Sequence, residues 1–104
     1  MLILPIKKKW FDMIKSGEKK EEYREIKQYY TSRFRNYLSI PCIIDRTTVH
    51  IANPKFEIIF RNGYNHNSPS IKCRCVVYTG QGKEEWGAEP NKEYYILEIL
   101  EVLD

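Results

Sequence analysis

The stretch Ser16–Arg24 most constrains the fold, because it ends an amphipathic helix and at once begins a charged strand. Upstream, apolar residues recur at helical spacing from Trp10 onward, and Gly17 stands where a left-handed residue commonly ends a helix. These patterns predict a helix over Lys8–Ser16 that stops at Gly17, followed by a strand over Lys20–Arg24.

The predicted strand interleaves charges of both signs. In a regular strand Glu22 and Arg24 share one face, and Lys19 lies on the other. A shared polar pocket therefore requires Lys19 to sit in the Gly17 turn, where the backbone can direct its side chain back toward the other two. The alternative is a solvated edge strand, whose charges prevent pairing with other chains.

The rest of the chain predicts short strands and one further helix. The strong turn dipeptide Asn62-Gly63 indicates a hairpin with a loop from Asn62 to Pro69, and the glycines and proline of Thr79–Glu93 indicate a second loop. The other predicted elements are strands over Leu2–Ile6, Phe56–Arg61, Ser70–Tyr78 and Tyr94–Leu103, a helix over Ile26–Leu38, and two ambiguous segments, Cys42–Ile44 and Thr48–Ile51.

Length and element order favour one α+β domain. A chain of 104 residues with 42% hydrophobic content can bury one core, so we expect a single domain over residues 1–104. Short strands with two helices are typical of a small mixed β-barrel with helices at its side. The aromatic residues Tyr29, Tyr30, Phe34 and Tyr37 recur at helical spacing and are predicted to face the core.

The cysteines and histidines do not form a recognisable site. Cys73 and Cys75 alternate along a predicted strand, which is a poor arrangement for a disulfide, so we expect buried reduced thiols and no disulfide-linked partner. Together with His50 and His66 they do not match zinc-ligand spacing. We therefore predict no metal, no cofactor and no catalytic cysteine.

The N-terminus predicts a cytoplasmic protein. The apolar run Met1–Leu4 is too short for a signal peptide or a membrane span, and three lysines, Lys7 to Lys9, follow it closely. We expect a soluble protein with no membrane partner.

Charge is distributed unevenly along the chain. The net charge is +3, with cations crowded into the first third and an acidic last third. A basic half with exposed aromatic rings is the footprint expected of an RNA binder, although an ordinary mixed surface can carry the same charge. Tyr64 and Trp86, each in a glycine-containing loop, are candidates to stack on an unpaired base. The alternative for Trp86 is that it anchors its loop to the barrel.

The N-terminal motif resembles that of the ASCH domain family. The signature G-x-K-x-x-E-x-R is matched by Gly17, Lys19, Glu22 and Arg24, after a strand containing Leu4-Pro5-Ile6 and a helix with Trp10 and Phe11. The closing strand Tyr94–Ile99 is also similar in pattern, so the resemblance covers most of the chain. It implies a PUA-like β-barrel with a cleft at the motif, and similar small proteins are often encoded by phages and prophages.

The resemblance implies an RNA- or nucleotide-binding module whose ligand contacts are Lys19, Glu22, Arg24, Tyr64 and Trp86. Lys19 and Arg24 would contact phosphate or a base edge, with Arg24 the better bidentate donor. Glu22 would hold Arg24 in place or accept hydrogen bonds from the exocyclic amine of a base.

The alternative is a hydrolase acting on a modified nucleoside or on RNA. Some ASCH-like proteins are amidohydrolases of acetylated cytidine that use a Lys, a Thr three residues later and a more distant Glu. Lys19 matches the Lys, Glu22 replaces the Thr, and Glu85, or its neighbours Glu84 and Glu89, would supply the distant acid. The candidate catalytic residues are thus Lys19, Glu22 and Glu85. A third possibility is a protein-interaction adaptor that uses the tyrosines of the second helix.

Overall fold

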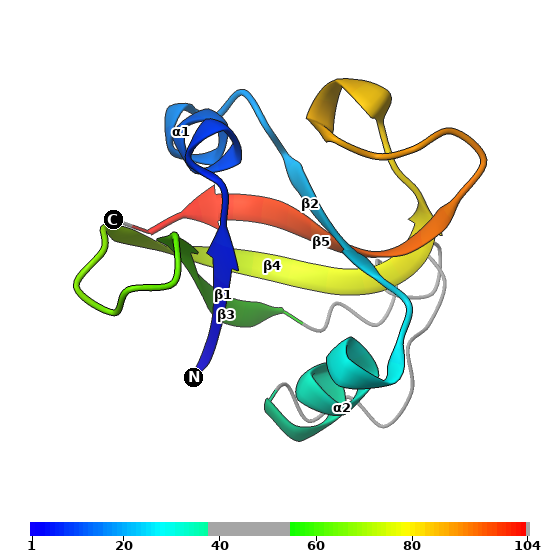
Figure 1. The fold of residues 1–104 in the computed structure, drawn as a ribbon, viewed down its shortest axis with the longest axis horizontal. Helices are drawn as coiled ribbons and strands as arrows, with labels where there is room; N and C mark the ends of the chain where they lie inside the picture. The colour runs from blue at the N-terminus through cyan, green and yellow to red at the C-terminus, as the bar shows by residue number, and fades with distance from the viewer. Residues whose placement is uncertain (38–54, 104) are drawn as a thin grey trace.

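The computed structural model describes residues 1–37 and 55–103. The elements, in chain order, are β1 (Leu2–Ile6), α1 (Lys8–Ser16), β2 (Glu21–Glu25), α2 (Gln28–Tyr37), β3 (Phe56–Asn62), β4 (Ser70–Gln81), the 3₁₀ turn η1 (Glu84–Trp86) and β5 (Glu93–Val102). The α+β prediction is confirmed: five strands form one curled mixed sheet, a half-barrel, accompanied by two helices (Figure 1).

The strands follow the order β1-β3-β4-β5-β2 across the sheet. Strand β1 pairs in parallel with β3, and the other neighbours pair antiparallel. Strands β1 and β2 are therefore the two edges of the sheet, and the ladders of the described strands do not join them. The described strands thus form a curled half-barrel that their own ladders do not close.

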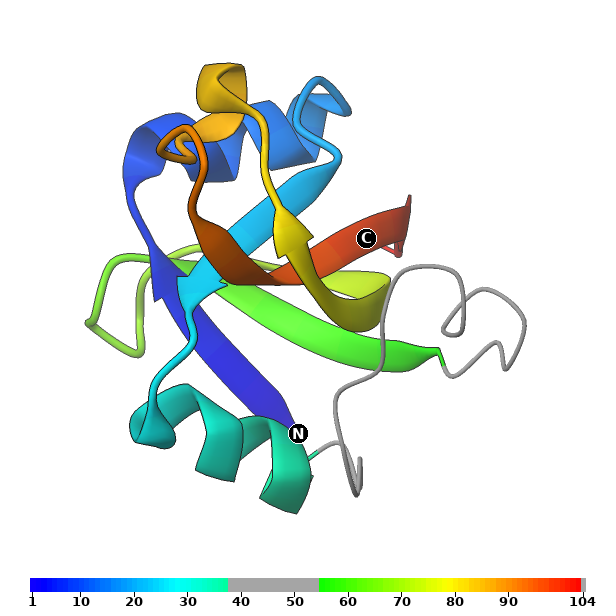
Figure 2. The same cartoon turned by 90° about the vertical axis from the view of Figure 1, so that its right-hand side faces the viewer.

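The helices lie at opposite ends of the curled sheet, and η1 lies at the same end as α1 (Figures 1 and 2). Helix α1 buries Phe11 and Ile14. It ends at Gly17 as predicted, because Gly17 has φ 87° and donates its N–H to the carbonyl of Ile14 at 3.1 Å. None of the helices in the described part of the chain is both long and apolar enough to cross a membrane.

The prediction that the aromatic stripe of α2 faces the core is wrong for two of its rings. Tyr29 and Tyr37 are 54% and 55% exposed, whereas Phe34 is fully buried. The helix packs on the sheet through Tyr30 and Phe34, and Phe34 meets Tyr95 edge-on at a ring separation of 5.0 Å. Tyr29 and Tyr37 lie on the neighbouring ridge of the helix, so they point away from this contact.

The main core consists of apolar side chains from the strands and both helices, including Phe11, Ile14 and Phe34. Strand β4 contributes to both faces of the sheet, because Val77 belongs to this core and the adjacent Val76 belongs to a smaller cluster with Tyr78 and Ile96. The remaining members of the main core are Leu2, Leu4, Ile6, Ile58, Phe60, Ile71, Cys73, Cys75, Tyr95, Leu97 and Ile99.

The cysteine prediction is confirmed for Cys73 and Cys75, which are buried free thiols. Burial is the main reason why the pKa of Cys75 is raised, so this thiol stays protonated and unreactive. Within residues 1–37 and 55–103, no three His, Cys, Asp or Glu side chains are grouped so that they could hold a metal ion. Cys42 and His50 lie outside the described residues.

Most predicted boundaries agree with the structure to within a few residues. The β3–β4 hairpin forms as predicted, and the Asn62 N–H donates across its loop to the carbonyl of Pro69 at 2.8 Å. Strand β4 continues to Gln81 instead of ending at Tyr78, because its ladder with β5 persists through Thr79, Gly80 and Gln81. The segments predicted at Cys42–Ile44 and Thr48–Ile51 lie outside the described residues.

Candidate functional site

The turn after α1 places Lys19 inside the protein. The backbone N–H of Lys19 donates to the carbonyl of Met13 at 2.9 Å, so the chain folds back over the last turn of the helix. The Lys19 side chain is only 1% exposed. As the alternation along the strand requires for a shared polar cluster, Lys19 lies in the turn after Gly17, before β2 begins, on the side of the strand that Glu22 and Arg24 occupy.

The buried amine of Lys19 has both polar and aromatic neighbours. Its Nζ donates to the backbone carbonyl of Trp86 at 2.5 Å and lies 3.3 Å from Oε1 of Glu22. The rings of Trp10 and Tyr23 lie 4.6 and 5.0 Å from the same nitrogen. Burial lowers the pKa of Lys19, and the carboxylate of Glu22 opposes that effect without cancelling it.

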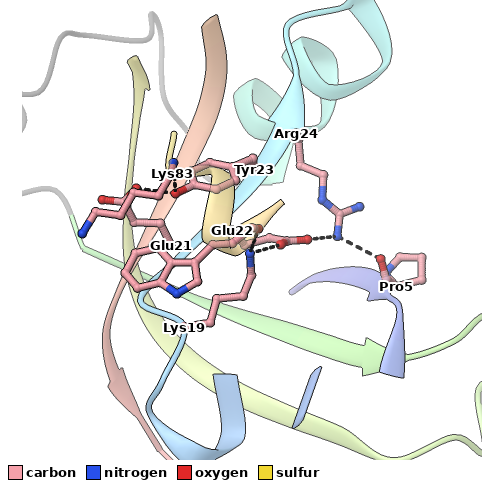
Figure 3. A network of polar contacts seen from close by, with 8 residues as sticks. Pro5, Lys19, Glu21, Glu22, Tyr23, Arg24 and Lys83 are labelled. Atoms are coloured by element: carbon pink, nitrogen blue, oxygen red, sulfur yellow. Dashed lines mark hydrogen bonds and ion pairs between the residues drawn. The ribbon is translucent and has the colours of Figure 1, made fainter. Parts of the chain in front are cut away.

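Glu22 and Arg24 extend this network across the sheet (Figure 3). Arg24 donates from Nη2 to Oε2 of Glu22 at 2.8 Å and to the carbonyl of Pro5 at 2.9 Å, and from Nη1 to the hydroxyl of Tyr30 at 3.2 Å. One guanidinium thereby connects β2, β1 and α2 across the two edges of the sheet. Within the described residues, Nε of Arg24 is buried and has no hydrogen-bond partner.

A pocket of about 730 Å³ opens at these edges. Its lining includes Asn62, Gly63 and Gly87, and the Gly63 N–H donates to the carbonyl of Ile6 at 3.0 Å, which links the β3–β4 loop to the end of β1. Six aromatic side chains border it: Trp10, Tyr23, Tyr30, Tyr64, Trp86 and Tyr94.

Charged side chains of both signs border the same pocket. The cations are Lys7, Lys8, Arg24, Lys27 and Lys92, and the carboxylates are Glu22, Glu25 and Glu89. Two of the lysines are already neutralised, since Lys8 pairs with Asp12 at 2.6 Å and Lys92 pairs with Glu89 at 3.3 Å. Within the described residues, Lys7 and Lys27 have no carboxylate within 4 Å.

The structure brings together four of the five predicted ligand contacts. Glu22, Arg24, Tyr64 and Trp86 border the pocket, and Lys19 lies behind Glu22 without reaching the pocket surface. Tyr64 is 90% exposed in the β3–β4 loop. Of the predicted distant acids, Glu89 borders the pocket, whereas Glu84 and Glu85 do not.

Trp86 anchors its loop and also borders the pocket. Its backbone carbonyl accepts a hydrogen bond from Lys19, which fixes the η1 turn, and Nζ of Lys83 lies over its half-buried ring at 4.6 Å. A second bond fixes the same turn, because the Lys83 N–H donates to the hydroxyl of Tyr23 at 2.9 Å. The ring of Trp86 is thus held in place by backbone contacts.

The sequence did not indicate several other side chains of the pocket. The sequence predicts Tyr30 as part of the aromatic stripe of a helix and Tyr94 as part of the closing strand. Lys27 also borders the pocket, and the polar residues around it do not indicate a binding site. The run of lysines that starts at Lys7 follows the apolar N-terminus and belongs to the basic third of the chain, and neither feature indicates a pocket. Aromatic residues next to basic ones, as in Lys27 to Tyr30, were the available clue.

No family model, curated protein or solved structure matches this chain.

Proposed function

We propose that the chain is a small ASCH-like module of the PUA-like type that binds RNA or a nucleotide, and that the pocket between β1 and β2 receives an unpaired nucleotide. The observation that supports this best is that six aromatic rings and five cationic side chains border one pocket. A nucleotide offers both a flat ring and a negative charge, which match these two kinds of side chain.

Each group in the pocket has a matching group on a nucleotide. Aromatic rings stack on bases, and each such contact contributes about 1–3 kcal/mol in single-stranded complexes. Lysine and arginine attract phosphate, and carboxylates accept hydrogen bonds from exocyclic amines. A volume of about 730 Å³ also falls within the range of pockets that enclose small ligands.

The binding role fits the geometry better than the hydrolytic alternative does. Lys19 and Glu85, two of the three candidate catalytic residues, do not border the pocket. The third, Glu22, already accepts contacts from Lys19 and Arg24. Hydrolysis of a modified nucleoside or of RNA therefore stays a prediction, as does a phage or prophage origin.

The test is binding of a labelled single-stranded RNA oligonucleotide by the full chain. Replacing Tyr64 by Ala should weaken binding by about 1–3 kcal/mol, because it removes a ring that can stack on a base. Tyr37→Ala is the matched control, since Tyr37 is also an exposed tyrosine but does not border the pocket. No detectable binding at low salt, or equal effects of the two substitutions, would count against the proposal.

A further inference from the structure

A cation and an aromatic ring are also paired outside the pocket, on the exposed side of α2. Arg33 lies over the ring of Tyr29 at 4.5 Å, and Tyr29 is 54% exposed. In every other cation–ring pair between described residues the ring borders the pocket, whereas neither Tyr29 nor Arg33 borders it. The Tyr29–Arg33 pair therefore repeats the chemistry of the pocket on a neighbouring surface.

This surface is continuous with the pocket. The ring of Tyr29 meets the ring of Tyr30 edge-on at 5.0 Å, and Tyr30 borders the pocket. Lys27 also borders the pocket and lies over the ring of Tyr30 at 5.6 Å. The resulting run of side chains, with a cation at each end and two rings between, leads from the pocket onto the outer side of α2.

The cation of the Tyr29–Arg33 pair is not neutralised by a neighbouring acid. Helix α2 contains no acidic residue, and among the described residues no carboxylate lies within 4 Å of Arg33. The nearest acidic residue in the sequence is Glu25, which is exposed, so that solvent and salt screen its charge. A phosphate can therefore approach Arg33 without breaking an ion pair.

The ring of Tyr29 also orders the guanidinium beside it. An arginine that is stacked on a ring has lost part of its rotamer freedom before a ligand arrives, so its donors lose less conformational entropy on binding. Unpaired bases stack on aromatic rings and on guanidinium planes alike. The Tyr29–Arg33 pair thus offers a phosphate contact and a stacking surface at one place.

We propose that the Tyr29–Arg33 pair is a second subsite for single-stranded RNA, which receives the nucleotide next to the one in the pocket. Arg33 contacts the phosphate of that nucleotide, and its base stacks on the pair. This inference rests on the proposed function for the nucleotide in the pocket, and it adds that the ligand is a strand. Tyr37 lies about two helical turns beyond Tyr29 and is not part of the subsite.

The test measures how affinity depends on the length of the ligand. Uridine monophosphate and single-stranded oligouridines of increasing length are bound to the full chain, and wild type should bind the oligonucleotides more tightly. Tyr29→Ala should lower oligonucleotide affinity about tenfold, because a stacking ring is lost, and should leave the affinity for the mononucleotide unchanged. Tyr29→Phe keeps the ring and should bind as wild type does.

Two arginine substitutions separate a local contact from long-range attraction. Arg33→Gln should weaken oligonucleotide binding and make the slope of log affinity against log salt shallower by about 0.7, the value for one phosphate of a single strand. Arg35→Gln is the matched control, since it removes the same charge from the same helix. Arg35 is exposed and lies about 200° around the helix from Arg33, so its substitution should have a much smaller effect.

The outcomes distinguish this inference from the proposed function. Equal effects of Arg33→Gln and Arg35→Gln would indicate general electrostatic attraction and overturn the subsite. Oligonucleotides that bind no better than the mononucleotide, or that bind Tyr29→Ala as well as wild type, also overturn it. The proposed function then survives, and the exposed side of α2 is left to another partner, such as an acidic protein.

The reverse result is equally informative. If oligonucleotide binding depends on Tyr29 and Arg33 but not on Tyr64, the subsite is correct and the proposed function of the pocket fails. If none of these ligands binds at low salt, both proposals are wrong.

Discussion

Lys19 holds neighbouring groups of the pocket in place and does not itself border the pocket. Its amine fixes the carbonyl of Trp86 and one oxygen of Glu22, and its side chain is almost fully buried. It therefore fixes the carboxylate of Glu22 and the backbone at Trp86 without bordering the pocket itself. Arg24 likewise serves structure and pocket together, since it bonds to Pro5 and Tyr30 as well as to Glu22.

The lowered pKa of Lys19 predicts how stability depends on pH. Because burial moves the pKa below 10.5 in the folded protein, the unfolded chain binds more protons between the lowered value and 10.5. The contribution of Lys19 to the free energy of unfolding should therefore rise with pH within that interval and level off above it.

Urea unfolding of wild type and Lys19→Met at several pH values up to 10.5 measures this contribution as a difference. Subtracting the free energy of unfolding of Lys19→Met from that of wild type removes the contribution of the other lysines and of the tyrosines, which titrate in both proteins. A difference that falls with pH, or one that does not change, would show that the amine is not destabilised by burial.

Lys19 and Arg24 also show which contacts a sequence can predict and which it cannot. Side chains alternate between the two faces of a strand, so Lys19 could join Glu22 and Arg24 only from the Gly17 turn, and this local geometry was enough to predict its place. Besides Glu22, Lys19 and Arg24 use the backbone carbonyls of Trp86 and Pro5 as acceptors. Every residue has such a carbonyl, so no pattern of side chains indicates which one a distant cation will reach.

At the scale of elements, the segment that leads into η1 depends on a glycine. A Cβ at Gly82 would lie 2.6 Å from the ring of Tyr23 and 2.8 Å from Cβ of Ala88. Both neighbours belong to packed parts of the structure, so neither can move at low cost. The η1 turn and the ring of Trp86 thus lie where they do because residue 82 has no side chain.

Gly82→Ala should destabilise the protein by about 1–3 kcal/mol, since it overpacks a close contact. It should also weaken RNA binding, because the displaced turn carries Trp86 away from the pocket. Thermal unfolding and oligonucleotide binding measure the two effects. Gln81→Ala, an exposed neighbour at the end of β4, should change both by much less, and equal losses in the two variants would refute the packing argument.

Helix α2 shows why an element can be predicted while its orientation is not. Its aromatic residues fall on two adjacent ridges, and both ridges have helical spacing. Tertiary contacts such as the packing of Phe34 against Tyr95 determine which ridge faces the core. Tyr29 and Tyr37 are exposed because of that tertiary contact. The spacing of apolar residues along the helix does not indicate it.

For the whole molecule, charge predicts the salt dependence of binding. The pocket offers Lys7, Lys27 and Arg24 as cations for phosphate, so binding of a short single-stranded RNA should have a slope of log affinity against log salt of about −0.7 for each phosphate neutralised. Lys7→Gln should make that slope shallower by about one such step.

Lys15→Gln is the matched control, because Lys15 is an exposed lysine at the other end of α1 and does not border the pocket. Affinity that is independent of salt would indicate a neutral ligand instead of a nucleic acid. A slope that changes equally in both variants would place the phosphates outside the pocket.

The overall class of the fold was predictable, whereas the position of the pocket was not. Each helix and strand could be predicted, because its residue pattern depends on neighbours in sequence, and together these elements indicate an α+β domain. The pocket lies where β1 and β2 approach each other, and that approach follows from the curl of a five-stranded sheet. Curl accumulates over all the strands, so no single stretch of sequence indicates it.

The opening between β1 and β2 has a consequence for motion. The two edges are connected by the side chain of Arg24 and its partners, and single side-chain contacts break without the cooperative loss of a ladder. The edge strands should therefore open locally while β4 stays protected, and their amide protons should exchange with solvent sooner. A nucleotide that touches both edges would slow this exchange, so that binding becomes visible at backbone amides that never meet the ligand.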